Sequence, residues 1–183
     1  MLDLREKSLP DYIEVDGSKY RIKTDFRHWL DFETKAKDPY DNLLNILDLL
    51  EDDVPQDKLF NVYLELVAFY ANENSTPKKT GSNFEQVVDF VDDGEFIYSS
   101  FLQAYNIDLL KVDMHWWIFK ALFLGLPEDT KIKQIMGFRG YKPSKKTNEA
   151  MYKELKSAWM LPPKLTKEEQ EAMQEWSNQF YNT

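Results

Sequence analysis

Residues 12–23 alternate apolar and polar side chains on either side of a short turn. Tyr12 to Val15 and Tyr20 to Ile22 follow the period of two that is typical of a β-strand, and Asp16-Gly17 lies between them. Asp-Gly favours the tight turns of hairpins, because both central residues of such a turn take positive φ. The pattern predicts a β-hairpin. A lone hairpin is marginal in water, so it must pack on helices or pair with another chain.

The rest of the chain follows the helical period, with apolar residues three and four positions apart. Thr24-Asp25 offers an N-cap, and Pro39, Pro55 and Pro127 separate successive stretches. The stripe over 56–71 is apolar round most of its surface, so we expect it at the centre of the core. The helices expected are those over residues 24–33, 39–50, 56–71, 95–105, 113–126, 128–136, 148–160 and 166–180. The sequence predicts a mainly α fold, a multi-helix domain with a small N-terminal β-hairpin.

Turn-forming residues divide the chain at two places. Residues 72–82 are rich in asparagine, serine, threonine, proline and glycine, which indicates a flexible linker. Pro162-Pro163 precedes the last helix, which opens with the capping box Thr-Lys-Glu-Glu at 166–169. We therefore expect a single α-rich domain over 1–163 and a C-terminal helical extension over 164–183.

The composition excludes several classes of protein. The chain has no cysteine, which excludes zinc ribbons, iron–sulfur ligation and thiol catalysis. Its apolar runs are too short for a signal peptide or a bilayer span, so we expect no membrane partner and a protein kept in a cytoplasm.

Charge is unevenly distributed along the sequence. The net charge is −11 over residues 1–126, +6 over 127–167 and −4 over 168–183. An acidic body with one basic segment argues against nucleic-acid binding, which needs a broad basic face. The basic segment, with Lys131, Lys133 and Arg139 as candidate partner-binding residues, could dock an acidic neighbour or a second copy of the chain. A solvated lysine-rich surface is the alternative. The free edge of the hairpin offers a second means of self-association.

The two histidines give little support for catalysis or metal binding. His28 has Asp25 and Asp31 three residues to either side, a spacing compatible with a weak metal site, although charged neighbours of a surface histidine are commonplace. His115 follows Asp113, but nothing nearby resembles a nucleophile elbow. Packing against an aromatic core or capping a helix end is the simpler role for His115.

Other catalytic patterns are missing too. The six glycines form no phosphate-binding loop. Asp52-Asp53 and Asp92-Asp93 precede expected helices, where the helix dipole favours acidic residues, so we interpret both pairs as caps. We expect no enzyme activity and no cofactor.

The helix expected over 113–126 carries more aromatic residues than one buried stripe needs. Trp116 and Phe119 share a stripe, while Trp117 points partly elsewhere. Such a helix is either deep in the core or has one face against a partner. Trp116, Trp117 and Phe119 are therefore candidate partner-binding residues, with core packing as the alternative.

Several segments together resemble one known family. They are Leu9-Pro10, Thr24 to Leu30, Phe101 to Leu110, Met114 to Thr130 and Lys133 to Arg139. Over about residues 9–160 the chain is similar to the gene-product-fifteen family of long-tailed phages and prophages of Gram-positive bacteria.

The resemblance implies a role through gene position, because the family is encoded just ahead of the tape measure protein in the tail module. That is the position of the tail assembly chaperones, which bind the tape measure protein while the tail tube polymerises and leave before the particle is finished. It implies residence in the host cytoplasm, absence from the mature virion, and no catalytic or cofactor site.

Two alternatives to a chaperone stay open. The protein could be a structural tail component that remains in the virion, or an acidic inhibitor of a host nucleic-acid enzyme. The basic segment over 127–167 weakens the second, because it spoils the mimicry of DNA charge. The expected partners are the tape measure protein, other tail assembly proteins and a second copy of the chain.

Overall fold

The computed structural model describes residues 4–35, 46–72, 86–142 and 149–162. Within these ranges the chain is mainly helical, with one two-stranded antiparallel sheet, as the sequence predicts. The elements are β1 (Tyr12–Val15), β2 (Ser18–Arg21), α1 (Phe26–Lys35), the 3₁₀ turns η1 (Leu47–Leu49) and η2 (Gln56–Lys58), α3 (Leu59–Ala71), α4 (Gly94–Tyr105), α5 (Trp116–Leu124), α6 (Lys131–Arg139) and α7 (Glu149–Ala158). Most of the linker expected over 72–82 and the helix expected over 166–180 lie outside the described residues.

The hairpin forms as its sequence predicts. Asp16 and Gly17 have φ of 51° and 74°, the left-handed values that a two-residue turn of this kind requires. Ile13 pairs with Tyr20 across the two strands, and both side chains are buried. The outer edge of β2 is partly occupied by the chain itself, because the Arg21 N–H donates to the Asp52 carboxylate and the Arg21 carbonyl accepts from Glu51.

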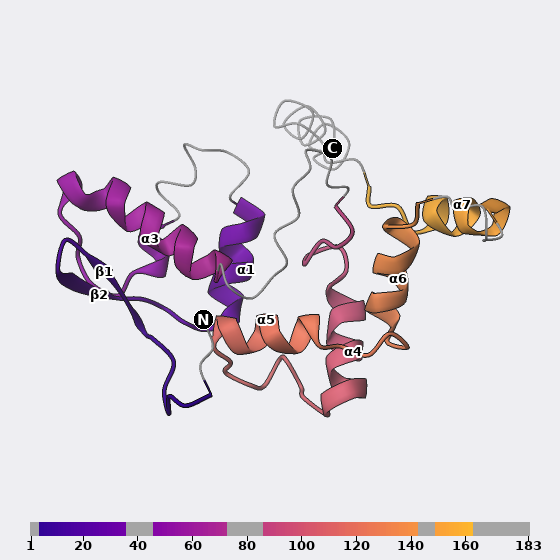
Figure 1. Cartoon of the computed structure of the whole chain (residues 1–183), viewed down its shortest axis with the longest axis horizontal. Coiled ribbons are helices and arrows are strands. Elements are labelled where there is room, and N and C mark those ends of the chain that lie inside the picture. The colour runs from indigo at the N-terminus through magenta and orange to yellow at the C-terminus, as the bar shows by residue number, and fades with distance from the viewer. Residues whose placement is uncertain (1–3, 36–45, 73–85, 143–148, 163–183) are drawn as a thin grey trace, which may run out of the picture.

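Helix α5 joins two groups of elements (Figure 1). The hairpin, α1 and α3 lie at one end of the long axis, and α4, α6 and α7 lie at the other. The Phe119 ring of α5 is sandwiched between Phe26 of α1 and Phe101 of α4, with ring centroids 4.7 and 5.3 Å apart and nearly parallel planes. This aromatic stack makes one continuous core from the two ends of the molecule.

Helices α5 and α6 begin later than the sequence pattern predicts, because neighbouring backbone is already paired. Residues 113–115 run beside 24–26, with hydrogen bonds from Phe26 N–H to Met114 O and from Trp116 N–H to Thr24 O, so α5 starts at Trp116. A turn closed by Thr130 on the Pro127 carbonyl delays α6 to Lys131. Of the helix expected over 39–50, the described part, from residue 46 onward, contains only the 3₁₀ turn η1.

The central position expected for helix 56–71 is wrong. One face of α3 is buried through Val62, Leu66 and Phe69. On the opposite face Phe60 is 64% exposed and Leu64 is 48% exposed. The helix is apolar round most of its surface, as read from the sequence, but it lies at the end of the molecule and has one uncovered side.

Candidate partner-binding site

The three aromatic residues selected from the sequence lie in the core. Trp116 is 2% exposed, Trp117 8% and Phe119 1%. Their interpretation as partner-binding residues is therefore corrected, because a side chain with so little accessible surface cannot make a substantial contact with another protein. Core packing, the alternative left open by the sequence, accounts for them.

The two tryptophans and Lys120 also donate hydrogen bonds to the C-terminal end of α3. The last carbonyls of a helix lack partners within it. The Trp117 indole N–H donates to Phe69 O at 2.9 Å, and the Trp116 indole N–H donates to Tyr70 O at 3.0 Å. The Lys120 ammonium donates to Tyr70 O and to Ala71 O at 3.0 and 2.8 Å. Side chains of α5 thus cap α3, and the positive charge of Lys120 lies at the negative end of the helix dipole.

His115 caps the start of α5, in agreement with the non-catalytic interpretation. Its Nδ1 accepts the Trp117 N–H at 3.1 Å, and its Nε2 lies 3.1 Å from the Pro10 carbonyl, to which it donates. Both contacts can form at once only when the imidazole is neutral with its proton on Nε2. Partial burial lowers the pKa of His115, which favours that neutral form.

The outer face of α5 is apolar and uncharged. Ile118, Ala121 and Leu124 are exposed along it, and the one charged residue of the helix, Lys120, is turned towards α3. Leu122 and Tyr105 lie half-buried beside this face, on the side of α4. The Tyr105 hydroxyl of α4 donates to the Leu122 carbonyl at 3.0 Å. We define the α5 face as Ile118, Ala121, Leu122 and Leu124. In a chain that is 30% charged, an exposed helix face without charge is a candidate contact surface.

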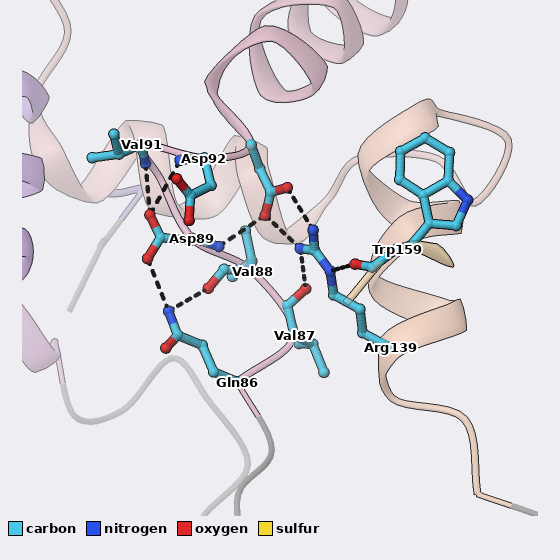
Figure 2. Close-up of polar contacts among 9 residues, drawn as sticks. Gln86, Val87, Val88, Asp89, Val91, Asp92, Arg139 and Trp159 are labelled. Atoms are coloured by element: carbon cyan, nitrogen blue, oxygen red, sulfur yellow. Dashed lines mark hydrogen bonds and ion pairs between the residues drawn. The ribbon is translucent and has the colours of Figure 1, made fainter. Parts of the chain in front are cut away.

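Arg139, the third basic residue selected from the sequence, is buried in an ion pair and is not available to a partner. Its guanidinium makes two hydrogen bonds to the Asp93 carboxylate, at 2.6 and 2.9 Å, and the side chains are 8% and 1% exposed. Arg139 also donates to the carbonyls of Val87 and Trp159 (Figure 2). One side chain therefore ties the segment before α4 to the end of α6 and the end of α7.

This ion pair also corrects the interpretation of the acidic pairs as caps. Asp93 stands at the N-cap of α4, but its carboxylate makes no capping bond and instead binds Arg139 and the Asp89 N–H. Asp52 binds Arg21 across the hairpin edge. Spacing along the chain could not reveal either contact, since their partners are 46 and 31 residues away in the sequence.

Asp89 orders the segment that precedes Asp93. Its carboxylate accepts from the N–H groups of Val91 and Asp92 and from the Gln86 side-chain amide, as Figure 2 shows. A cavity of about 360 Å³ lies beside this segment and is lined by Glu33, Thr34 and residues 86–90. Because the Asp89 carboxylate is already engaged in the turn, we interpret it as a structural residue.

Lys131 and Lys133 lie on α6 and make contacts within the chain. The Lys131 ammonium sits 4.3 Å from the centre of the Trp159 ring. The Lys133 ammonium lies 3.4 Å from Leu124 O and 3.9 Å from the Glu128 carboxylate. Their role in partner binding stays a prediction.

Among the described residues, no three His, Asp or Glu side chains converge in a way that could hold a metal ion. Asp25, considered with His28 as a weak metal site, instead binds Arg27 and the Met114 N–H. In the same part of the chain no helix has the length and hydropathy to cross a bilayer.

Comparison with known proteins gives one match. The family described as Bacteriophage Gp15 protein matches residues 5–161. No curated protein and no solved structure matches the chain.

Proposed function

The chain belongs to the bacteriophage Gp15 family, and on that premise we propose that it acts as a tail assembly chaperone that binds the tape measure protein of its phage. We propose a binding role and no catalytic one. We further propose that the protein works in the host cytoplasm, together with other tail assembly proteins, and is absent from the finished particle.

The observation that carries this proposal is the α5 face. Ile118 and Leu124 are exposed, and Leu122 is half-buried, on a helix that is fixed in the core by its other side. An amphipathic helix of a client protein can lay its own apolar stripe along such a face, in the helix-in-groove manner. A tape measure protein is long, helical and rich in apolar stretches, so it offers many segments of this kind. The chain's net charge of −9 would keep the complex soluble.

Co-expression with the tape measure protein of the same phage tests the proposal. Wild-type protein should keep the tape measure protein soluble and purify with it. The double substitution Ile118→Gln/Leu124→Gln should weaken binding at least tenfold, about 1.4 kcal/mol, because apolar anchors at the centre of an interface carry much of the binding energy. Leu47→Gln is the matched control, since Leu47 and Leu124 are both 46% exposed and Leu47 lies on η1, outside the α5 face.

The results separate the alternatives. A wild-type protein that neither binds nor solubilises the tape measure protein rules out the chaperone function. Equal binding by the α5 variant and the Leu47 control keeps the function but moves the contact elsewhere. Mass spectrometry of purified virions distinguishes a retained structural component, which would be present in stoichiometric copies, from a chaperone, which would be found at most in traces.

A further inference from the structure

Helix α7 lies at one end of the long axis, beyond α6 (Figure 1), and adds little to the core. No side chain of α7 is fully buried. Its apolar residues Tyr152 and Leu155 are half-buried, and they are not part of the buried core that runs from the hairpin to α6. Segments with few buried apolar contacts open at a lower free energy than the core does.

Several contacts between α7 and the rest of the chain converge on Trp159, which follows the helix directly. The Trp159 N–H donates to the Leu155 carbonyl at 3.0 Å, so this residue is joined to the last turn of α7. Its ring meets Phe96 of α4 edge-on, with ring centroids 5.6 Å apart. The Lys131 ammonium of α6 lies 4.3 Å from the centre of the same ring. The Trp159 carbonyl accepts from Arg139, as Figure 2 shows. Trp159 therefore holds α7 on both α4 and α6.

The contacts beneath α7 do not depend on it. If α7 leaves, Arg139 loses the Trp159 carbonyl but keeps two hydrogen bonds to Asp93 and one to the Val87 carbonyl. Helix α6 also stays anchored in the interior by its buried isoleucines. The buried ion pair and the packing of α6 on α4 can therefore persist without α7.

The helical form of α7, in contrast, depends on its docking. With 10 residues, α7 is shorter than the roughly 12–15 residues at which an isolated helix becomes even marginally stable in water. The ion pair between Glu149 and Lys153, with nitrogen and oxygen 2.7 Å apart, lies at the surface and adds little. Release of α7 from α4 and α6 and loss of its helical structure are therefore one step.

We propose that α7 and Trp159 form a strap that opens as one unit while α4, α5 and α6 stay folded. Opening takes the indole ring away from Phe96 and from the Lys131 ammonium. The surface of α4 and α6 that the strap covers then becomes accessible. Lys131, selected from the sequence as a candidate partner-binding residue, is thus partly covered in the closed form and uncovered in the open one.

Hydrogen exchange of the full chain, measured by mass spectrometry, tests the proposal. In the wild type, the amides of α7 should exchange at least roughly tenfold faster than those of α6, yet more slowly than unstructured amides, because α7 opens without global unfolding. Trp159→Ala should speed exchange in α7 by at least roughly another tenfold and leave α5 and α6 unchanged. Met160→Ala is the matched control, because Met160 is the next residue, is also large and apolar, and is 67% exposed.

Brief labelling with an amine-reactive ester shows whether opening uncovers the surface. Lys131 should be labelled faster in the Trp159→Ala variant than in the wild type. Lys111, whose side chain is 83% exposed, should be labelled equally fast in both proteins. Equal labelling of Lys131 would mean that the strap does not control access to it, and this would overturn the proposal.

The exchange experiment can overturn the proposal in other ways. Amides of α7 that exchange as slowly as those of α6 would make the helix an integral part of the fold, and amides that exchange at the unstructured rate would mean that it is not docked. The proposal also fails if Trp159→Ala leaves exchange in α7 unchanged, or speeds exchange in α5 and α6 equally. Because no tape measure protein is involved, these results are independent of the proposed function.

Discussion

Replacing Arg139 should cost more stability than any change of a surface ion pair in this protein. Arg139→Met leaves the Asp93 carboxylate buried, with the Asp89 N–H, 2.8 Å away, as its remaining described hydrogen-bond donor. Removing one partner of a buried pair costs about 3–5 kcal/mol, since the other charge loses its compensation without regaining water. The substitution also removes the donors to the carbonyls of Val87 and Trp159, which adds to the loss.

Urea denaturation followed by circular dichroism measures this effect. With a slope of about 1–3 kcal/mol per molar urea, the midpoint should fall by at least about 1 M. Arg21→Met is the control, because Arg21 forms a comparable two-bond pair with Asp52 at the surface, where its side chain is 64% exposed. A surface pair is worth at most about 1 kcal/mol. Arg139→Lys, which keeps the charge but loses the paired geometry, should lie between the two.

A double-mutant cycle separates the ion pair from the packing of the same side chains. Asp93→Leu/Arg139→Met removes both charges, so it should lose clearly less stability than the sum of Asp93→Leu and Arg139→Met. The reasoning fails if Arg139→Met costs no more than the Arg21 control. It also fails if the two single losses simply add.

Two further predictions concern His115, which caps the start of α5, and Lys120, which caps the end of α3. The pKa of His115 is lowered in the folded protein, so the unfolded chain binds a proton first as the pH falls, and the stability that this histidine contributes above about pH 6.5 is lost on acidification. The variant His115→Asn keeps a capping side chain, so its free energy of unfolding should fall less between about pH 7 and pH 5 than that of the wild type. An equal fall in the two proteins would exclude the neutral cap. Lys120→Met should lower the free energy of unfolding by about 1–3 kcal/mol in urea denaturation, because the Ala71 carbonyl loses its donor and the Tyr70 carbonyl keeps only the Trp116 indole N–H. Lys111→Met is the control: its side chain is 83% exposed, so the loss should be at most about 1 kcal/mol. Equal losses in the two variants would contradict the capping role of Lys120.

The sequence predicts the local elements well because their signals are local. Asp16-Gly17 is enough to place the hairpin turn, since few other residue pairs accept two positive φ values. The period of apolar residues locates α1, α3, α4 and α7 to within a few residues. The start of α5 shifts to Trp116 because its N–H is hydrogen-bonded to the distant Thr24 carbonyl, which the local pattern cannot reveal.

The candidate site was harder to predict because hydrophobic periodicity does not tell which face of a helix is covered. Trp117 has the pattern of a partner contact, but its indole N–H binds the end of α3, and an indole offers large apolar area and one donor in either setting. Phe60 has the pattern of a core residue and is exposed. Charged neighbours could have identified Phe60 as exposed, because Asp57 and Glu65 border it in the sequence pattern of its helix. No charged residue marks the exposed positions of α5 in the same way.

In the proposed function, the α5 face has to serve a client that is long and carries many similar apolar segments. Helix α5 lies between α3 and α7 (Figure 1), and Ile118 and Leu124 are exposed on it. Several copies can therefore bind successive segments of one client, each copy through its own α5 face. Every bound copy removes apolar surface of the client from water, and this opposes aggregation of the client. Because each contact covers only one helix face, single copies can leave one by one.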